Sequence, residues 1–309
     1  MGAIYFDQRA SDDERRKALY DGAIFVYSPT VSTSKLCALG RRMIEEAFAP
    51  LDPKSVDRHL SMEEAASILA KLKPQFIHHP ECKTLVPAIV KELGGDPEKT
   101  YFDVPRLRSA YPTHYLTSGI AYAFHPHRDT WYSAPMCQIN WWFPIFDIAA
   151  DNCLALYPEY FGESVENNSE IYNYQIWNRT NRADAARHVR SDSRQQPKPT
   201  RKLDLRGVRL ICPPGGMILF SGAHLHETVP NTSGIARYSI DFRTVYLDDV
   251  LARAGAHNLD ARCTGTTMRD FLRCTDLQRV PEAIAKSYDD GTELARKVPA
   301  LVSDMNVRS

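Results

Sequence analysis

One stretch of the sequence decides the fold class: residues 215–239 read GGMILFSGAHLHETVPNTSGIARYS. It opens on a glycine turn, continues as a short apolar run at 217–220, and leads through Pro and Gly to a second run at 236–246. Short apolar runs bounded by turn residues predict β-strands. Similar runs occur earlier, at 120–124, 137–145 and 153–157. Many short strands without alternating helices favour a sandwich or barrel over a parallel sheet.

The first hundred residues predict mainly helices. Apolar residues recur at helical spacing over 32–48, and a further helix is expected over 82–93. Capping signals at Ser11 and Ser61 predict helices that end near residues 21 and 72. A short apolar strand is expected at 23–27. We expect these helices to pack against the strands that follow.

We therefore predict a single domain over residues 1–309. A helical N-terminal buttress (1–99) precedes the β core (100–247), and a C-terminal extension (248–309) returns to a helical pattern. A polar insert at 160–200, rich in Asn and Arg, interrupts the strands. Long insertions of this kind are commonly disordered surface excursions or active-site lids, and both interpretations stay open.

Composition excludes several classes of protein. The 309 residues are 43% hydrophobic and 25% charged, with 38 basic and 38 acidic side chains. Such a chain is not globally disordered, has no apolar run long enough to span a membrane, and has no excess positive charge for nucleic acid. The N-terminal residues lack the apolar core of a secretory signal. The seven cysteines form no C-x-x-C pair, which argues against a disulfide framework or a thiolate zinc site. We expect a cytoplasmic protein that acts on a small molecule.

Two histidine clusters stand out, FHPHRD at 124–129 and GAHLHE at 222–227. The first contains His127 and Asp129, and side chains two residues apart at a strand end point the same way. An imidazole from another strand would complete a face of two histidines and one carboxylate, which suits Fe(II) and dioxygen chemistry. A His-x-Asp pair alone is weak evidence, because a buried or turn histidine is the commoner case.

The downstream segment strengthens the case. The chain carries HRD at 127–129, HETVPNTS at 226–233 and an arginine at 237, eleven residues after the second histidine. This set resembles the Fe(II)/2-oxoglutarate-dependent oxygenases, specifically the phytanoyl-CoA dioxygenase-like family. The resemblance covers 100–247 well and 10–30 weakly, and it leaves 250–309 unexplained. It implies a double-stranded β-helix (a cupin-like jelly roll), mainly β with flanking helices.

The resemblance also implies roles for residues. It makes His127, Asp129 and His226 the catalytic metal ligands, and the distance to Arg237 selects His226 rather than its neighbour His224. Arg237 would bind the distal carboxylate of 2-oxoglutarate, since a planar guanidinium suits a bidentate carboxylate.

Two hydroxyls, those of Thr228 and Ser239, are placed to help hold the 2-oxoglutarate carboxylate. They match motifs from different branches of the family, so we do not expect them to be equally important.

One face of the expected strand at 136–143 carries Gln138, Asn140 and Trp142. Buried amides need partners. Either this face lines the cavity, with Gln138 at the co-substrate and the other two at the substrate, or neighbouring strands satisfy it. Trp131 either walls the site or simply packs.

Further substrate contacts follow from alternation. If Arg237 faces inward, Ser239, Asp241 and Arg243 share its side. A second inward arginine, here Arg243, would favour a substrate with a carboxylate or phosphate; the alternative is a surface arginine paired with Asp241. Arg106 and Arg108 raise the same choice. Five residues of the insert could fold over the substrate or remain solvated: Tyr172, Tyr174, Trp177, Arg179 and Arg182.

The implied activity is removal of hydrogen from an unactivated C–H bond of a small polar, amino-acid-like metabolite. It would give hydroxylation, desaturation or ring closure, using Fe(II), 2-oxoglutarate and O2, with succinate and CO2 as co-products. The presence of Asp129 argues against halogenation. A cupin-like metal enzyme without 2-oxoglutarate and a non-catalytic jelly-roll binding protein remain the alternatives. We expect a small-molecule substrate and a second copy of the chain as partners, and neither nucleic acid nor membrane.

Overall fold

The computed structural model describes residues 2–180, 187–190 and 196–290, in which helices and strands are mixed. The N-terminal part contains β1 (Ile4–Phe6), α1 (Asp12–Tyr20), β2 (Ile24–Tyr27), α2 (Val31–Phe48), a 3-10 helix (Pro53–Arg58), α3 (Met62–Ile77) and α4 (Pro80–Glu92). The middle part contains β3 (Thr100–Phe102), β4 (Arg106–Ala110), β5 (Ile139–Pro144), β6 (Leu154–Leu156), α5 (Tyr174–Thr180), β7 (Val208–Arg209), β8 (Met217–Ser221), β9 (His226–Thr228) and β10 (Arg237–Tyr246). The last part contains α6 (Leu247–Ala252), β11 (Leu272–Arg273) and α7 (Glu282–Ser287).

The predicted N-terminal helices are confirmed. Ser11 and Ser61 each form a capping box with the glutamate three residues later, so two free backbone N–H groups at each helix start are satisfied. Helix α3 runs past the expected end at residue 72 and continues through Pro74 to Ile77. Burial of Phe76 in the core offsets the backbone hydrogen bond that Pro74 cannot make.

The strands form one large and one small sheet. The large sheet has the order β1-β2-β8-β5-β10-β3-β11, with β4 also paired to β10, and the small one has the order β7-β6-β9. Strands with helices beside them are thus present as expected, but helices and strands are mixed and the chain is not mainly β. The jelly-roll assignment stays a prediction.

One predicted strand is wrong. Residues 120–124 form a 3-10 turn (Gly119–Ala121) followed by irregular backbone. Gly119 has a positive φ of 59°, and the N–H groups of Ala121 and Tyr122 bond to carbonyls three residues earlier. These local bonds use the groups that a sheet partner would need.

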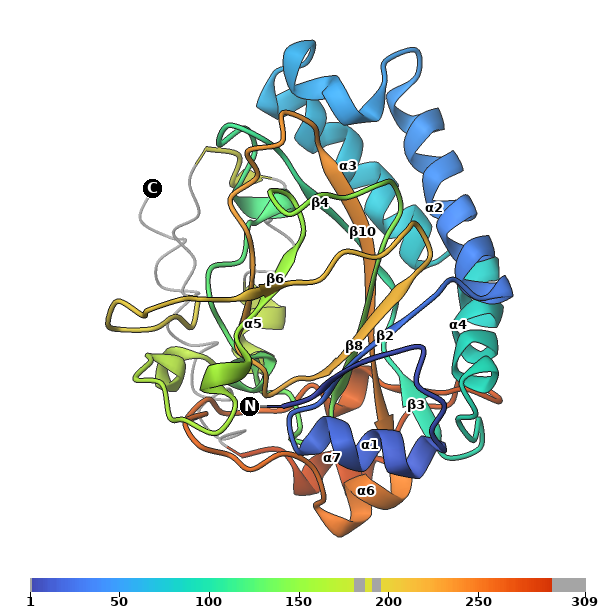
Figure 1. Cartoon of the computed structure of the whole chain (residues 1–309), viewed down its shortest axis with the longest axis vertical. Helices are drawn as coiled ribbons and strands as arrows, with labels where there is room; N and C mark the ends of the chain where they lie inside the picture. The colour runs from blue at the N-terminus through green and yellow to red at the C-terminus, as the bar shows by residue number, and fades with distance from the viewer. Residues whose placement is uncertain (1, 181–186, 191–195, 291–309) are drawn as a thin grey trace, which may run out of the picture.

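Helices α2, α3 and α4 lie along one side of the molecule, outside β8 and β10, whereas β6 and α5 lie on the other side (Figure 1). Helix α2 approaches the sheet at Gly40, where a Cβ atom added to the glycine would lie 3.1 Å from Ile145 Cδ1, 3.4 Å from Ile240 Cδ1 and 3.5 Å from the Phe76 ring. A glycine at this position lets the helix and the sheet pack closely.

Strand β10 divides its side chains between two environments. Tyr238, Ile240 and Phe242 are buried in the hydrophobic core that includes the helices. Arg237, Asp241 and Arg243, one residue out of phase, line a pocket in the interior. The alternation predicted from the sequence is therefore present. One face of β10 packs in the hydrophobic core, and the other carries polar side chains into the pocket.

The C-terminal extension is less helical than predicted. Between residues 248 and 290 most of the chain is irregular, because its N–H groups bond to neighbouring loops and to β3, which β11 joins as an edge strand. Residues 291–309 lie outside the described part. No helix within the described residues is both long and apolar enough to cross a bilayer.

Replacing Gly40 with leucine is expected to lower the free energy of unfolding by about 1–3 kcal/mol, because the new side chain has no space against Ile145 and Ile240. Chemical denaturation measures this change. Ala38, exposed on the same helix, provides the control, since Ala38→Leu meets no packed neighbour. Equal stability of the two variants would contradict the close packing described above.

Candidate metal centre and its pocket

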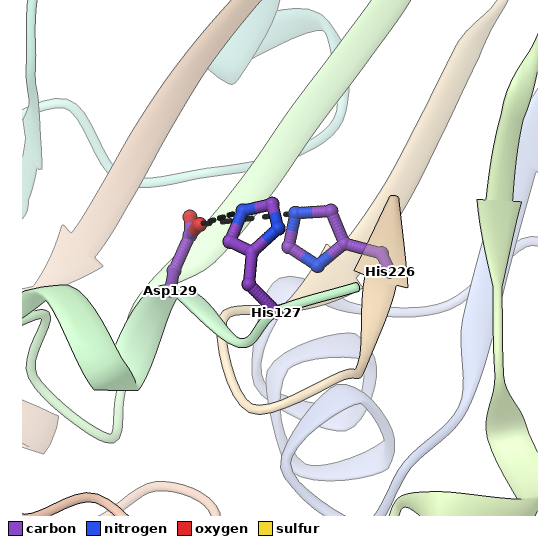
Figure 2. Close-up of side chains that lie close together, drawn as sticks. All are labelled: His127, Asp129 and His226. Carbon is purple, nitrogen blue, oxygen red and sulfur yellow. Dashed lines mark ion pairs between the residues drawn. The ribbon is translucent and has the colours of Figure 1, made fainter. Parts of the chain in front are cut away.

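The backbone brings the two histidines together. His127 and His226 form an isolated antiparallel bridge: the His127 N–H donates to the His226 carbonyl at 3.0 Å, and the His226 N–H returns the bond at 2.9 Å. Residues paired in this way project their side chains to the same face. The imidazole rings consequently lie beside each other, 4.3 Å apart between centroids (Figure 2).

Both rings are oriented by a carbonyl two residues earlier in the chain. His127 Nδ1 lies 2.8 Å from the His125 oxygen, and His226 Nδ1 lies 2.9 Å from the His224 oxygen. A carbonyl can only accept, so each Nδ1 carries the proton and donates. Each Nε2 therefore presents a lone pair, as a metal ligand requires.

Asp129 faces these lone pairs. Its Oδ1 lies 3.6 Å from His127 Nε2 and 3.8 Å from His226 Nε2 (Figure 2). Two ligands at about 2.1 Å from one ion lie at most about 4.2 Å apart, so these separations suit a shared cation. All three side chains are buried, and their ligand atoms lie within 4.8 Å of one another. The described chain thus contains a two-histidine, one-carboxylate site that fits a divalent metal.

The other oxygen of Asp129 is held by protein groups. Its Oδ2 accepts a 2.8 Å hydrogen bond from Gln138 Nε2 and lies 3.7 Å from Arg243 Nε. Burial raises the pKa of Asp129, but the hydrogen bond that a protonated His127 ring donates and the charge of Arg243 outweigh this and keep the pKa well below its ordinary value. The carboxylate is therefore ionised and oriented.

Burial, with repulsion from His127, lowers the pKa of His226 to about 4 despite the nearby Asp129 carboxylate. The ring is thus neutral near pH 7, the form that binds metals. His224 points elsewhere: it is fully buried against the rings of Phe161 and Phe220. Of these two neighbouring histidines, only His226 joins the metal site.

Arg128, between two of the predicted ligands, is almost fully buried and forms an ion pair with Asp260 at 3.1 Å. Its Nη2 donates to the carbonyls of Tyr160 and Glu163, both at 2.7 Å. Asp260 also accepts from the indole N–H of Trp131 at 2.7 Å. This network fixes the ligand-bearing loop to the insert and to the C-terminal extension.

Arg237 is buried and lacks an acidic partner. Its Nη1 donates to the Ser239 hydroxyl at 2.7 Å, its Nε has no hydrogen-bond partner, and no carboxylate lies within 4.0 Å among the described residues. Burial lowers the pKa of Arg237 to about 10, so the guanidinium is still charged near pH 7. Such a group is ready to receive an anion.

A cavity of about 350 Å³ joins these features. The predicted residues that line it are His127, Asp129, His226, Arg237, Thr228, Gln138, Asn140, Trp142 and Arg243. Ser239 lies buried behind Arg237. Gln138 Nε2 donates to Asp129 Oδ2 and also, at 2.9 Å, to Asn140 Oδ1. The amide of Gln138 thus supports the predicted metal ligand.

Trp131 is not brought to the cavity. It is fully buried in a separate cluster with Leu225, Val229 and others, and its indole N–H is used by Asp260. The alternative that it simply packs therefore matches its place in the structure.

Aromatic rings cover the metal site. The Phe124 ring lies 4.9 Å from that of His127, and Tyr132 lies 5.4 Å from it. The insert adds three rings to the cavity wall: Tyr172, Tyr174 and Trp177. Arg179 is exposed, and Arg182 lies outside the described residues.

The sequence reasoning missed part of the charged wall. Lys73 and Asp103 line the cavity, together with the arginines at 106 and 108 that the sequence left undecided. For Lys73 a signal existed, because it lies on the apolar stripe of α3 with Leu69, Leu72 and Phe76. For Asp260 the sequence contained no such signal, because its partners Arg128 and Trp131 are distant in the sequence.

No protein-family model matches this chain, and no curated protein does. Among solved structures, it is similar to EvdO2 from Micromonospora carbonacea var. aurantiaca, with 13% identity, 78% of this chain and 94% of that chain covered, and a TM-score of 0.44. EvdO2 has also been solved in complex with 2-oxoglutarate. AviO1 from Streptomyces viridochromogenes Tue57 gives 14% identity, coverage of 74% and 94%, and a TM-score of 0.37. ThoJ, a non-heme monooxygenase, gives 13% identity, coverage of 71% of each chain and a TM-score of 0.38. Similarity this remote carries no argument about function, so the function is argued from the geometry of the site.

The two neighbouring histidines provide a matched test of the metal site. His226→Ala is expected to weaken Fe(II) binding by more than about 100-fold, beyond the usual loss from an outer-shell change. His224→Leu is expected to leave the affinity within a few-fold of wild type, because its ring lies against Phe161 and Phe220 and not with the other ligand atoms. Anaerobic calorimetric titration measures both, and equal effects would rule out the assignment.

Asp260→Asn is expected to lower the free energy of unfolding by about 3–5 kcal/mol, because it leaves Arg128 as a buried charge without a counter-ion. Denaturant titration measures the loss. Asp204→Asn is the control, since Asp204 pairs with Arg206 at the exposed surface and should change stability by less than about 1 kcal/mol. Similar losses in the two variants would show that the Arg128–Asp260 pair is not special.

Proposed function

We propose that this chain is a non-haem Fe(II)/2-oxoglutarate-dependent oxygenase of the phytanoyl-CoA dioxygenase-like kind, built on a double-stranded β-helix. One observation carries the proposal: a buried His-Asp-His site and a buried guanidinium without an acidic partner line the same cavity. The first suits a metal with open coordination positions, and the second suits an anionic co-substrate.

Iron is favoured by the donor set. Two imidazoles and one carboxylate, with no thiolate, leave positions for other ligands, which is the arrangement of non-haem Fe(II) oxygenases. The carboxylate of Asp129 also argues against halogenation, because it fills the place that a halide would need.

The case for 2-oxoglutarate rests on Arg237. Ser239 holds one of its nitrogens, which directs the remaining donors. Its guanidinium carbon lies 5.4 Å from the centre of the Trp142 ring, so an apolar plane restricts its movement. Thr228, also on the cavity wall, offers a hydroxyl to the same carboxylate. A dicarboxylate that binds the metal at one end would meet this charge at the other.

When bound, iron, 2-oxoglutarate and dioxygen supply the oxidation that removes hydrogen from an unactivated C–H bond, with succinate and CO2 as co-products. The chain supplies orientation and shielding. Carbonyls fix both histidine rings, and Gln138 and Arg243 fix Asp129. The aromatic rings of Phe124, Tyr132 and the insert limit access of water to the metal.

Removal of the guanidinium tests the co-substrate directly. Arg237→Ala is expected to weaken 2-oxoglutarate binding to the Fe(II)-loaded protein by about 10- to 100-fold, because a charge-assisted carboxylate contact is lost. The weak visible absorption band of the iron chelate, followed under anaerobic titration, measures this affinity. Fe(II) affinity should change little.

Arg209→Ala serves as the control, because that arginine is largely exposed and donates to the Ala150 carbonyl. Iron binding without any chelate band in wild type would favour the cupin-like enzyme that does not use 2-oxoglutarate. Absence of iron binding would favour a non-catalytic binding protein.

A further inference from the structure

Lys73 projects from helix α3 into the cavity rather than into solvent. It shares a stripe with Leu69, Leu72 and Phe76, which are buried in the core. Its ammonium group donates to the carbonyl of Ile120, and among the described residues no carboxylate lies within 4.0 Å of it. An ammonium has three donors, so this single neutral acceptor leaves it under-satisfied.

The other charges on this wall are paired. Arg108 binds Asp241 through two nitrogens, at 2.6 and 3.3 Å. Arg106 and Arg243 both bind Asp103, at 2.5 and 2.9 Å. Asp270 accepts from the Tyr174 hydroxyl. Apart from the metal site and Arg237, the cavity therefore has four cations, Lys73, Arg106, Arg108 and Arg243, facing three carboxylates, Asp103, Asp241 and Asp270.

Among these four cations, Lys73 is the one with no carboxylate within 4.0 Å in the described residues. Burial, together with repulsion from Arg108, lowers the pKa of Lys73 to about 7 against a partial opposing effect of Asp241. A bound anion would relieve both the desolvation and the repulsion. A carboxylate, with one negative charge, balances one uncompensated cation, whereas a phosphate monoester would bring more.

The Phe124 ring lies near both the charged wall and the metal site. The guanidinium carbon of Arg108 lies 5.6 Å from the Phe124 ring centre, and that ring lies 4.9 Å from the His127 ring. The Phe124 ring thus contacts both Arg108 on the charged wall and the His127 ring at the metal site. A molecule held by its carboxylate beside Lys73 would present an uncharged part to the metal.

We propose that Lys73 binds a carboxylate of the substrate, with Arg108 beside it, and so selects small carboxylic acids whose reacting carbon lies away from the acid group. This assignment rests on the proposed oxygenase function, because only that function makes the bound acid a substrate. The anion site itself depends on Lys73 of α3 and Arg108 of β4 and requires no bound metal.

The test uses phenylacetate, whose ring suits the aromatic wall, and its neutral analogue phenylacetamide. Calorimetry is done on the protein alone and on the anaerobic protein loaded with Fe(II) and 2-oxoglutarate. Wild type should bind phenylacetate, Lys73→Met should bind it about 10- to 100-fold more weakly, and Lys73→Arg should stay within a few-fold. Phenylacetamide should bind wild type and Lys73→Met equally.

Two controls separate this site from a structural role and from the co-substrate site. Lys73→Met should be at least as stable as wild type in denaturant, because it replaces a partly buried charge that lacks a carboxylate partner with an apolar chain of similar length. Arg237→Ala should retain phenylacetate binding while losing affinity for 2-oxoglutarate.

The proposal is overturned if wild type does not bind phenylacetate, if wild type binds phenylacetamide as tightly as phenylacetate, or if Lys73→Met binds phenylacetate as tightly as wild type. A loss of stability in Lys73→Met would assign the lysine a structural role instead. If Fe(II) and 2-oxoglutarate fail to bind but phenylacetate binding still depends on Lys73, the anion site stands and the oxygenase function falls.

Discussion

The two backbone hydrogen bonds between His127 and His226 join parts of the chain about a hundred residues apart, and the geometry of the metal site depends on them. An antiparallel pair of this type projects both side chains to one face at a fixed spacing. The carbonyls of His125 and His224 then set the rotation of each ring. The two histidine ligands are therefore oriented by main-chain atoms before any ion binds, which limits the reorganisation that binding requires.

Charge in the cavity is arranged around this site. Most guanidinium groups on the cavity wall have carboxylate partners, as Arg108 has Asp241 and Arg243 has Asp103. This pairing lowers the free-energy cost of removing these charges from water. Arg237 and Lys73 are the exceptions in the described part of the cavity. Two under-satisfied cations, on different elements, are consistent with two separate anionic groups, one on the co-substrate and one on the substrate.

Local signals in the sequence predicted the helices and most strands, whereas the candidate metal ligands came from the family resemblance. Capping boxes at Ser11 and Ser61 and the alternation along residues 237–243 depend on neighbours in the chain, so a single sequence contains them. The error at 120–124 arose because hydrophobicity alone does not distinguish a strand from turns that begin at a positive-φ glycine. Asp260 was missed since its partners, Arg128 and Trp131, are close only in the folded chain.

Asp260 also changes how the C-terminal extension is interpreted. The family resemblance stops near residue 250, which would leave the later segment as an addition to a complete core. The contacts argue otherwise, because Asp260 neutralises the buried arginine between two predicted metal ligands and accepts the N–H of Val165 from the insert. Cys263 adds a bond to the carbonyl of Thr130, next to Asp129. A segment outside the recognisable motifs therefore contacts the ligand-bearing loop on both sides of Asp129, at Arg128 and Thr130, and contributes to its position.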